Sequence, residues 1–163
     1  MLDLHHIMIY SRGVARVNQQ PSTQIAAEIA AVADFRYALR MFLRRTVDAS
    51  NANGLTPQRY DLLLQIKNAS GGEATVSELT ERLVLPQPAV TELVKRAELA
   101  GLVRRRRDSE DGRVSRIGIT AEGERRLLAT FVELRADRSV LVAALMRAGR
   151  RFRAAAAAHA SHL

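Results

Sequence analysis

Residues 75–119 read TVSELTERLVLPQPAVTELVKRAELAGLVRRRRDSEDGRVSRIGI, and this stretch decides the fold. It opens with a capping box: the Thr75 side chain can accept a hydrogen bond from the amide three residues on, while Glu78 reaches back to the amide of Thr75. A short helix to Leu83 is predicted to follow. Because a second helix begins shortly after it, the segment predicts a helix-turn-helix.

The second helix is the candidate recognition helix. Pro86 and Pro88 confine its start, since proline is tolerated in a first turn and disrupts a helix interior, and Gly101 is a natural stop. At about 100° per residue, one face of this helix is apolar and the opposite face is polar. The apolar face holds Val90, Leu93, Val94 and Ala97, and the opposite face holds Pro88, Thr91, Glu92, Lys95 and Leu99, with Arg96 at its margin.

The residues after this helix change from a helical pattern to a basic hairpin. Four consecutive arginines, 104–107, are followed by the polar turn 108–112. Residues 114–119 then alternate, with Arg116 and Ile117 on opposite sides, which is the period of two expected of a strand. A basic hairpin directly after a helix-turn-helix is typical of a wing.

Long helices are predicted on both sides of this segment. After Pro21, Ser22 is a candidate N-cap for an amphipathic helix that ends at the turn-forming stretch 50–54. Thr120 caps a further long helix, which Gly149 is expected to end before an alanine-rich helix. One small domain cannot bury these helices, so the pattern favours a two-fold dimer.

Together these patterns predict a mainly α fold with a small β-hairpin wing, a winged helix-turn-helix joined to a helical dimerisation region. The predicted parts are an N-terminal arm at 1–21, expected to be disordered, an N-terminal dimerisation helix at 22–54, the winged helix-turn-helix DNA-binding domain at 55–120, and C-terminal dimerisation helices at 121–163.

The charge of the chain favours an acidic partner such as a phosphate backbone. Lys and Arg total 25 against 17 Asp and Glu, which gives a net charge of +8. Residues 95–116 contain eight basic side chains against four acidic ones, so one short segment carries half of this charge. A merely soluble basic surface is the alternative interpretation of the total charge.

The composition also excludes several classes of function. The chain has no cysteine, which excludes disulfides, Cys-ligated zinc and thiol catalysis and fits a reducing cytoplasm. No apolar run has the length of a signal peptide core or a membrane span, so we expect a cytoplasmic protein with no membrane partner. His159 and His162 have the spacing of helical metal ligands but no carboxylate close in sequence, and no catalytic constellation stands out. We therefore expect no enzyme activity, no metal and no cofactor.

The stretch 55–123 resembles the multiple-antibiotic-resistance regulator (MarR) family of bacterial transcription factors. Each matching piece is weak alone, but their order and spacing over about seventy residues make a strong joint signal. The pieces are Leu55-Thr56-Pro57-Gln58, Ser77-Glu78-Leu79, Ala89-Val90-Thr91, Gly101-Leu102-Val103, Asp111-Gly112-Arg113 and Ile119-Thr120-Ala121-Glu122-Gly123. The chain departs from the family at Glu92, Lys95 and Ala97, which affects the expected operator sequence and the fit of the recognition helix.

The resemblance implies a set of DNA-binding residues. It places Gln87, Pro88, Thr91 and Lys95 near bases or phosphates, and Ser77 at the DNA backbone. Lys95 can donate to guanine and Thr91 can contact a thymine methyl group, while Glu92 either accepts from cytosine N4 or acts against wrong sites. A solvated polar helix face is the alternative. The full predicted set is Ser77, Gln87, Pro88, Thr91, Glu92, Lys95, Arg96, Arg104, Arg106, Asp111 and Arg113.

Arg113 is predicted to lie at the wing tip, where an arginine can enter a narrow minor groove. Asp111 is expected to hold that guanidinium through a bidentate pair, with an ordinary exposed ion pair as the alternative. Because strand side chains alternate, only two of the four arginines at 104–107 can face the DNA, and the others are expected to pair with acids or water.

The predicted function is that of a homodimeric regulator that binds a near-palindromic site in double-stranded DNA. The family resemblance further implies a repressor that a small molecule, such as an aromatic acid or a phenol, releases from DNA. An architectural DNA binder without an effector is one alternative. A winged helix that binds an acidic protein is another, and the clustered cations argue against it.

Overall fold

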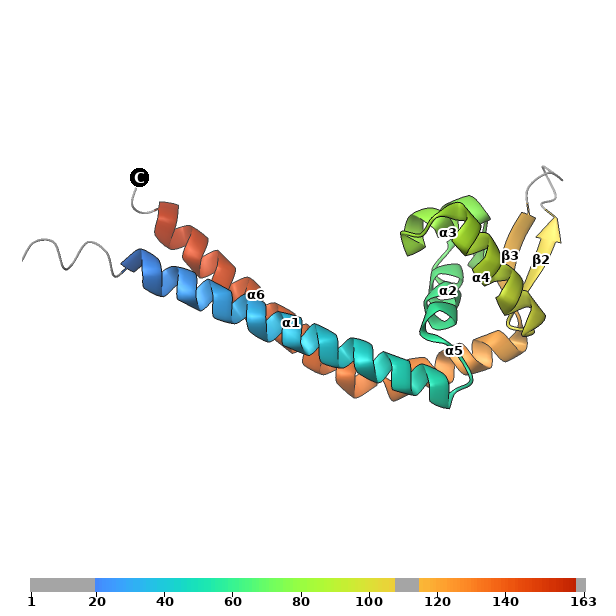
Figure 1. Ribbon diagram of the computed structural model, residues 1–163, viewed down its shortest axis with the longest axis horizontal. Coiled ribbons are helices and arrows are strands. Elements are labelled where there is room, and N and C mark those ends of the chain that lie inside the picture. The colour runs from blue at the N-terminus through green and yellow to red at the C-terminus, as the bar shows by residue number, and fades with distance from the viewer. Residues whose placement is uncertain (1–19, 108–114, 161–163) are drawn as a thin grey trace, which may run out of the picture. The chain divides into compact units, whose positions relative to one another are not determined.

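The computed structural model describes residues 20–107 and 115–160 (Figure 1). Its contacts divide the chain into two units. The winged unit comprises residues 43–137, and the paired-helix unit comprises residues 20–42 together with residues 138–160. Most of the described residues are helical, which confirms the mainly α fold predicted from the sequence.

The winged unit combines short helices with a small sheet. After α1 (Gln20–Ala52) it contains α2 (Pro57–Lys67), the short 3-10 helix η1 (Ser70–Gly72), β1 (Glu73–Ala74), α3 (Val76–Leu83), α4 (Gln87–Leu99), β2 (Val103–Arg107), β3 (Ser115–Ile119) and α5 (Ala121–Glu133). The sheet is antiparallel with the order β1-β3-β2, so β3 is its central strand. The sequence does not predict β1, because two residues are too few to show an alternating pattern.

Threonine caps fix where three of the helices in the winged unit begin. The Thr56 and Thr120 side chains accept hydrogen bonds from the amides of Arg59 and Gly123, at the starts of α2 and α5. Thr75 forms the predicted capping box, since its side chain accepts from the Glu78 amide while the Glu78 carboxylate accepts from the Thr75 amide. The capping box is therefore confirmed.

The apolar core of the winged unit draws on its helices and on the inner face of the sheet. The predicted apolar stripe of α4 is confirmed, because all four of its residues are buried in this core. Fully buried side chains elsewhere in the core include Leu62, Leu63, Ile66, Leu79, Leu102, Ile117, Leu127 and Leu134.

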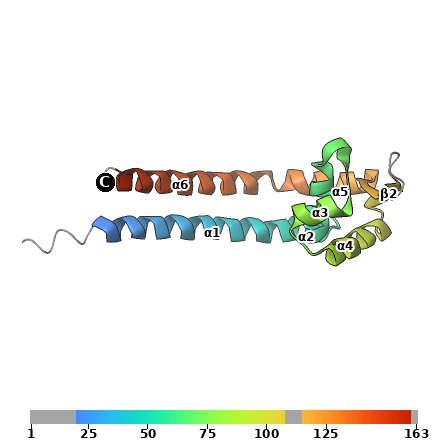
Figure 2. The same cartoon turned by 90° about the horizontal axis from the view of Figure 1, so that it is seen from above.

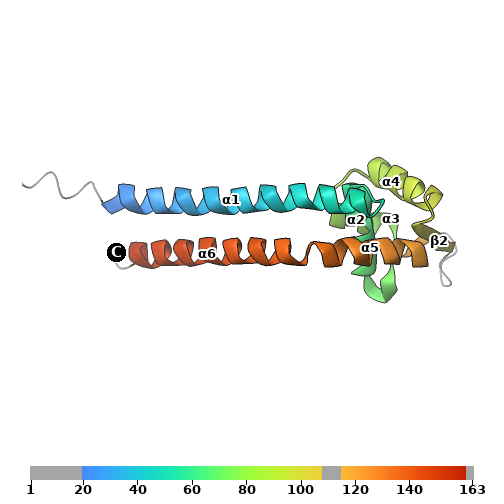
Figure 3. The ribbon, with the colours of Figure 1, turned by 90° about the horizontal axis from the view of Figure 1, so that it is seen from below.

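The paired-helix unit consists of the first part of α1 and most of α6 (Arg135–Ala160), which lie side by side (Figure 2, Figure 3). The buried residues described in this unit are Ala31, Ala144 and Ala148, each no more than 4% exposed. Small side chains allow two helices to approach closely. The larger apolar side chains of the same helices are exposed instead.

Two expected helix boundaries are wrong. α1 begins at Gln20, before the expected cap at Ser22, and Pro21 lies in its first turn, where proline is tolerated. Gly149 lies inside α6 and ends no helix, because one glycine costs a helix interior only about 1 kcal/mol and its neighbours are strong helix formers. The break falls at Leu134, which caps α5 and is buried in the winged core. No described helix combines the length and the apolar character needed to cross a membrane.

Candidate nucleic-acid interface

The turn between α3 and α4 sets the start of the candidate recognition helix. α3 ends at Val84, which adopts a left-handed backbone with φ 54°, and its amide donates to the Thr80 carbonyl. Pro86 is the N-cap of α4. The Val84 side chain is 86% exposed, so the turn holds an apolar side chain out in solvent.

α4 buries one face and exposes the other, as the sequence predicts. Val90, Val94 and Ala97 are fully buried. The predicted binding residues of α4 lie on the exposed face, namely Gln87, Pro88, Thr91, Glu92, Lys95 and Arg96. Ser77 is exposed in the first turn of α3, where backbone amides point outward.

One ion pair lies on the exposed surface of α4 itself. Arg96 Nε lies 3.3 Å from Glu92 Oε1, with the i, i+4 spacing of neighbours on a helix. Arg59 of α2 adds a hydrogen bond of 3.3 Å from its Nη2 to the Arg96 carbonyl oxygen. The Glu92 carboxylate therefore has an intramolecular partner, which reduces its repulsion of a phosphate.

β2 places its arginines alternately on the two faces of the sheet. Val103, at the start of the strand, is buried, and residues 104–107 are exposed. Arg105 Nε donates to Glu98 Oε2 of α4 at 3.1 Å, which links the last turn of α4 to β2. Arg106 Nη2 donates to Glu73 Oε2 of β1 at 2.8 Å. Two adjacent arginines thus bind acids, one on each face.

Gly118 of β3 explains how Glu73 reaches Arg106. The glycine lies between Glu73 and Arg104 in the sheet register. A Cβ at position 118 would lie 3.3 Å from Cγ of Glu73. The Glu73 side chain can therefore cross the sheet at Gly118, because glycine has no side chain. The hydrogen bond from Arg106 lowers the pKa of Glu73, and the charges of Arg106, Arg104 and Arg116 lower it further. This sheet face therefore concentrates positive charge.

The structure brings only part of the predicted site together. Arg104 and Arg106 are exposed on β2, and the α4 residues share one face. Asp111 and Arg113 lie outside the described residues, so their expected pair stays a prediction. Sequence reasoning missed Glu73 and Glu98 as partners of the wing arginines. Within the described part of the chain, no group of three His, Cys, Asp or Glu residues could hold a metal ion.

Comparisons with known proteins agree with this geometry. Residues 53–114 match a family model described as MarR family. The HTH-type transcriptional repressor MdtR of Bacillus subtilis is 30% identical over 97 residues, which is 60% of this chain and 59% of that protein. The chain therefore spans less than two thirds of the length of this curated relative.

Solved structures share the fold. The MarR family transcription regulator SP03579 covers 86% of this chain and 95% of its own, with a TM-score of 0.68 and 19% identity. A mutant of Escherichia coli MarR complexed with operator DNA covers 63% of this chain and 71% of its own, with a TM-score of 0.56 and 20% identity. At these identities the likeness concerns the fold, and it confirms the winged helix.

Proposed function

We propose that the chain is a sequence-specific DNA-binding transcriptional regulator of the MarR family, whose model matches residues 53–114. The proposal rests on the two faces of α4. Its apolar face is buried in the core, while its polar face is exposed beside a strand of arginines. A slim helix with fixed cations next to it has the shape and the charge that the major groove accepts.

The roles of the exposed α4 residues follow from their chemistry. Lys95 donates to guanine or to a phosphate, and Thr91 contacts a thymine methyl group. Gln87 and Pro88 lie at the start of the helix, where they face bases or the adjacent backbone. Glu92 selects against sites that offer no donor, because its carboxylate needs either a cytosine amino group or Arg96.

The wing supplies the second contact. Arg104 binds a phosphate from the outer face of the sheet, and a phosphate competes with Glu73 for the guanidinium of Arg106. Arg113 enters the minor groove, with Asp111 holding its guanidinium. Support from a related fold comes from Escherichia coli MarR, a mutant of which has been crystallised with operator DNA. The MepR protein of Staphylococcus aureus, also in mutant form, is bound to an oligodeoxyribonucleotide in another structure of this fold.

The regulator acts as a homodimer on a near-palindromic site. The paired-helix unit exposes Ile29 by 64% and Val140 by 62%, and a second copy would cover such side chains. A two-fold dimer places two recognition helices about one DNA turn, 34 to 36 Å, apart. The chain represses transcription, as the name of MdtR states for that protein, and a small effector releases it from DNA.

Titration of a labelled operator at several salt concentrations tests the proposal. Arg113→Ala should weaken binding and reduce the dependence of log K on log salt by about one ion, because one phosphate-region cation is lost. Thr91→Ala should change base preference more than the salt slope. Arg125→Ala, which removes an exposed cation from α5, is the matched control and should leave both unchanged.

Two outcomes would overturn the proposal. Unchanged DNA binding by Arg113→Ala would show that Arg113 of the wing does not contact the DNA. Equal affinity for operator and random DNA at physiological salt would instead indicate an effector-independent architectural DNA-binding protein.

A further inference from the structure

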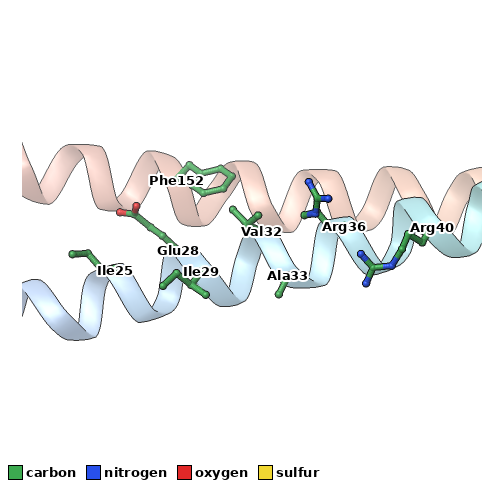
Figure 4. Close-up of a pocket in the computed structure, with 8 residues that line it drawn as sticks. All are labelled: Ile25, Glu28, Ile29, Val32, Ala33, Arg36, Arg40 and Phe152. Atoms are coloured by element: carbon green, nitrogen blue, oxygen red, sulfur yellow. The ribbon is translucent and has the colours of Figure 1, made fainter.

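A shallow groove runs along α1 in the paired-helix unit, with Phe152 of α6 on its other side (Figure 4). Ile25, Ile29 and Val32 line it and are 57%, 64% and 42% exposed. Single exposed apolar residues are ordinary on protein surfaces, but a continuous row of them along one helix face indicates an interaction surface.

Three charged residues line this groove, and two of them are arranged symmetrically about Val32 while the third, Arg40, lies further along α1. Glu28 lies four residues before it and Arg36 lies four residues after it, and both line the groove. Neither has a hydrogen-bond or ion-pair partner in the part of the chain that the structure describes. Asp34 is the other acid on this part of α1. Its Oδ2 lies 3.6 Å from Nη1 of Arg151 of α6, so this carboxylate is paired within the chain.

We propose that this groove is occupied by a second copy of the chain, with the two α1 helices antiparallel and crossing at Val32. The inference deepens the proposed homodimer and rests on it. In an antiparallel two-fold pair that crosses at Val32, Glu28 of each copy faces Arg36 of the other, so one surface supplies two ion pairs. The same geometry places Ile29 opposite Phe35 and Ile25 opposite Leu39, so apolar side chains also face one another.

Two neighbouring crossing points fit the charges of Glu28 and Arg36 less well. A crossing at Arg36 would place the two copies of this guanidinium against each other, which like-charge repulsion disfavours. A crossing at Ile29 would place Glu28 opposite Ala30 and leave the carboxylate without a partner. Because these two registers lose charge pairing, the charges of Glu28 and Arg36 favour the crossing at Val32 over them.

Disulfide trapping in the full chain tests the register, since the chain contains no cysteine. Val32→Cys places one thiol at the two-fold axis, where it meets its own copy and can form an intermolecular disulfide under mild oxidation. Ala30→Cys, an exposed position on the opposite side of α1, is the control and should stay monomeric on a denaturing gel. If Val32→Cys gives no covalent dimer while the chain sediments as a dimer, the register is wrong and the homodimer stands. If the chain sediments as a monomer at micromolar concentration, the homodimer fails as well.

Charge reversal provides a second test. Glu28→Arg and Arg36→Glu should each raise the dissociation constant of the dimer by about tenfold or more, because each creates two like-charge contacts. Combining them should bring the constant back to within about threefold of the wild type, as expected of residues in direct contact. A double variant that dissociates at least as readily as the single variants would overturn the pairing. Circular dichroism checks that all three remain helical.

Discussion

The winged unit and the paired-helix unit bury different kinds of side chain. In the winged unit large residues such as Leu62, Ile66 and Leu79 are fully buried. In the paired-helix unit the buried residues described are alanines, and large ones such as Ile29 and Met146 are 64% and 58% exposed. Burial of a large aliphatic side chain stabilises by about 1.5 to 3 kcal/mol, so most of that stabilisation within one chain lies in the winged unit.

Polar contacts also tie together the parts of the winged unit. In the winged unit Arg126 Nη1 donates to the Gly54 carbonyl at 2.9 Å, and Asn53 Nδ2 donates to Glu133 Oε2 at 2.9 Å, so the end of α1 is tied to α5. These hydrogen bonds hold the two ends of the winged unit together. The paired-helix unit instead leaves most of its large apolar side chains exposed.

Two glycine substitutions give the sharpest test of this difference, and Gly123→Ala should have the largest effect. A Cβ at Gly123 would overlap the Leu102 carbonyl oxygen, which belongs to the backbone and cannot move aside easily. The winged unit should lose about 3 kcal/mol of unfolding free energy, as expected of severe overpacking. Urea denaturation followed by circular dichroism measures this loss.

Gly149→Ala is the matched change in the paired-helix unit. A Cβ there would meet nothing within 4 Å, and the residue lies inside α6. Alanine is the better helix former, so this variant should be more stable by up to about 1 kcal/mol. Destabilisation by both variants to a similar degree would mean that the two units are packed alike.

Val84→Gly should have a smaller effect of opposite sign to Gly123→Ala. Val84 is held at φ 54°, a conformation that costs a β-branched residue about 1 to 2 kcal/mol and costs glycine little. Its side chain is 86% exposed, so little packing is lost. We expect about 1 kcal/mol of stabilisation in the same denaturation assay. Val84→Ala keeps the Cβ and should gain less, and an equal gain would attribute the effect to the exposed side chain instead.

Much of the winged unit could be predicted from the sequence, because its signals are local. The capping box at Thr75 spans four residues, and the buried stripe of α4 repeats within one helix. The pair of Arg96 with Glu92 could also have been found, since these residues stand at i, i+4. The exposed face of α4 follows from the same periodicity.

The partners of the wing arginines could not be predicted, because they depend on the sheet. Glu73 and Arg106 are 33 residues apart and meet through β3, whose pairing with β1 covers two residues. Glu98 meets Arg105 only because β2 turns back along α4. At Gly149 the local signal was misleading. Glycine was predicted to end a helix, but the helix-forming residues on both sides of it continue α6 through this position.

The smallest predicted effect concerns acid stability in the winged unit. Hydrogen bonds from Arg125 and then from Arg126 lower the pKa of Glu122 from 4.5 to about 2. A carboxylate whose pKa is depressed by folding stabilises the fold above its unfolded value, and this contribution disappears as the pH falls from about 4.5 to about 2. Glu122→Gln should therefore lose less stability than the wild type over this interval, as measured by thermal unfolding at a series of pH values. Arg125→Gln removes the donor with the largest effect, so its loss of stability should begin at the same pH of about 4.5 as in the wild type but should end at a higher pH. An acid profile that is identical in all three proteins would show that Glu122 contributes nothing to the stability of the winged unit.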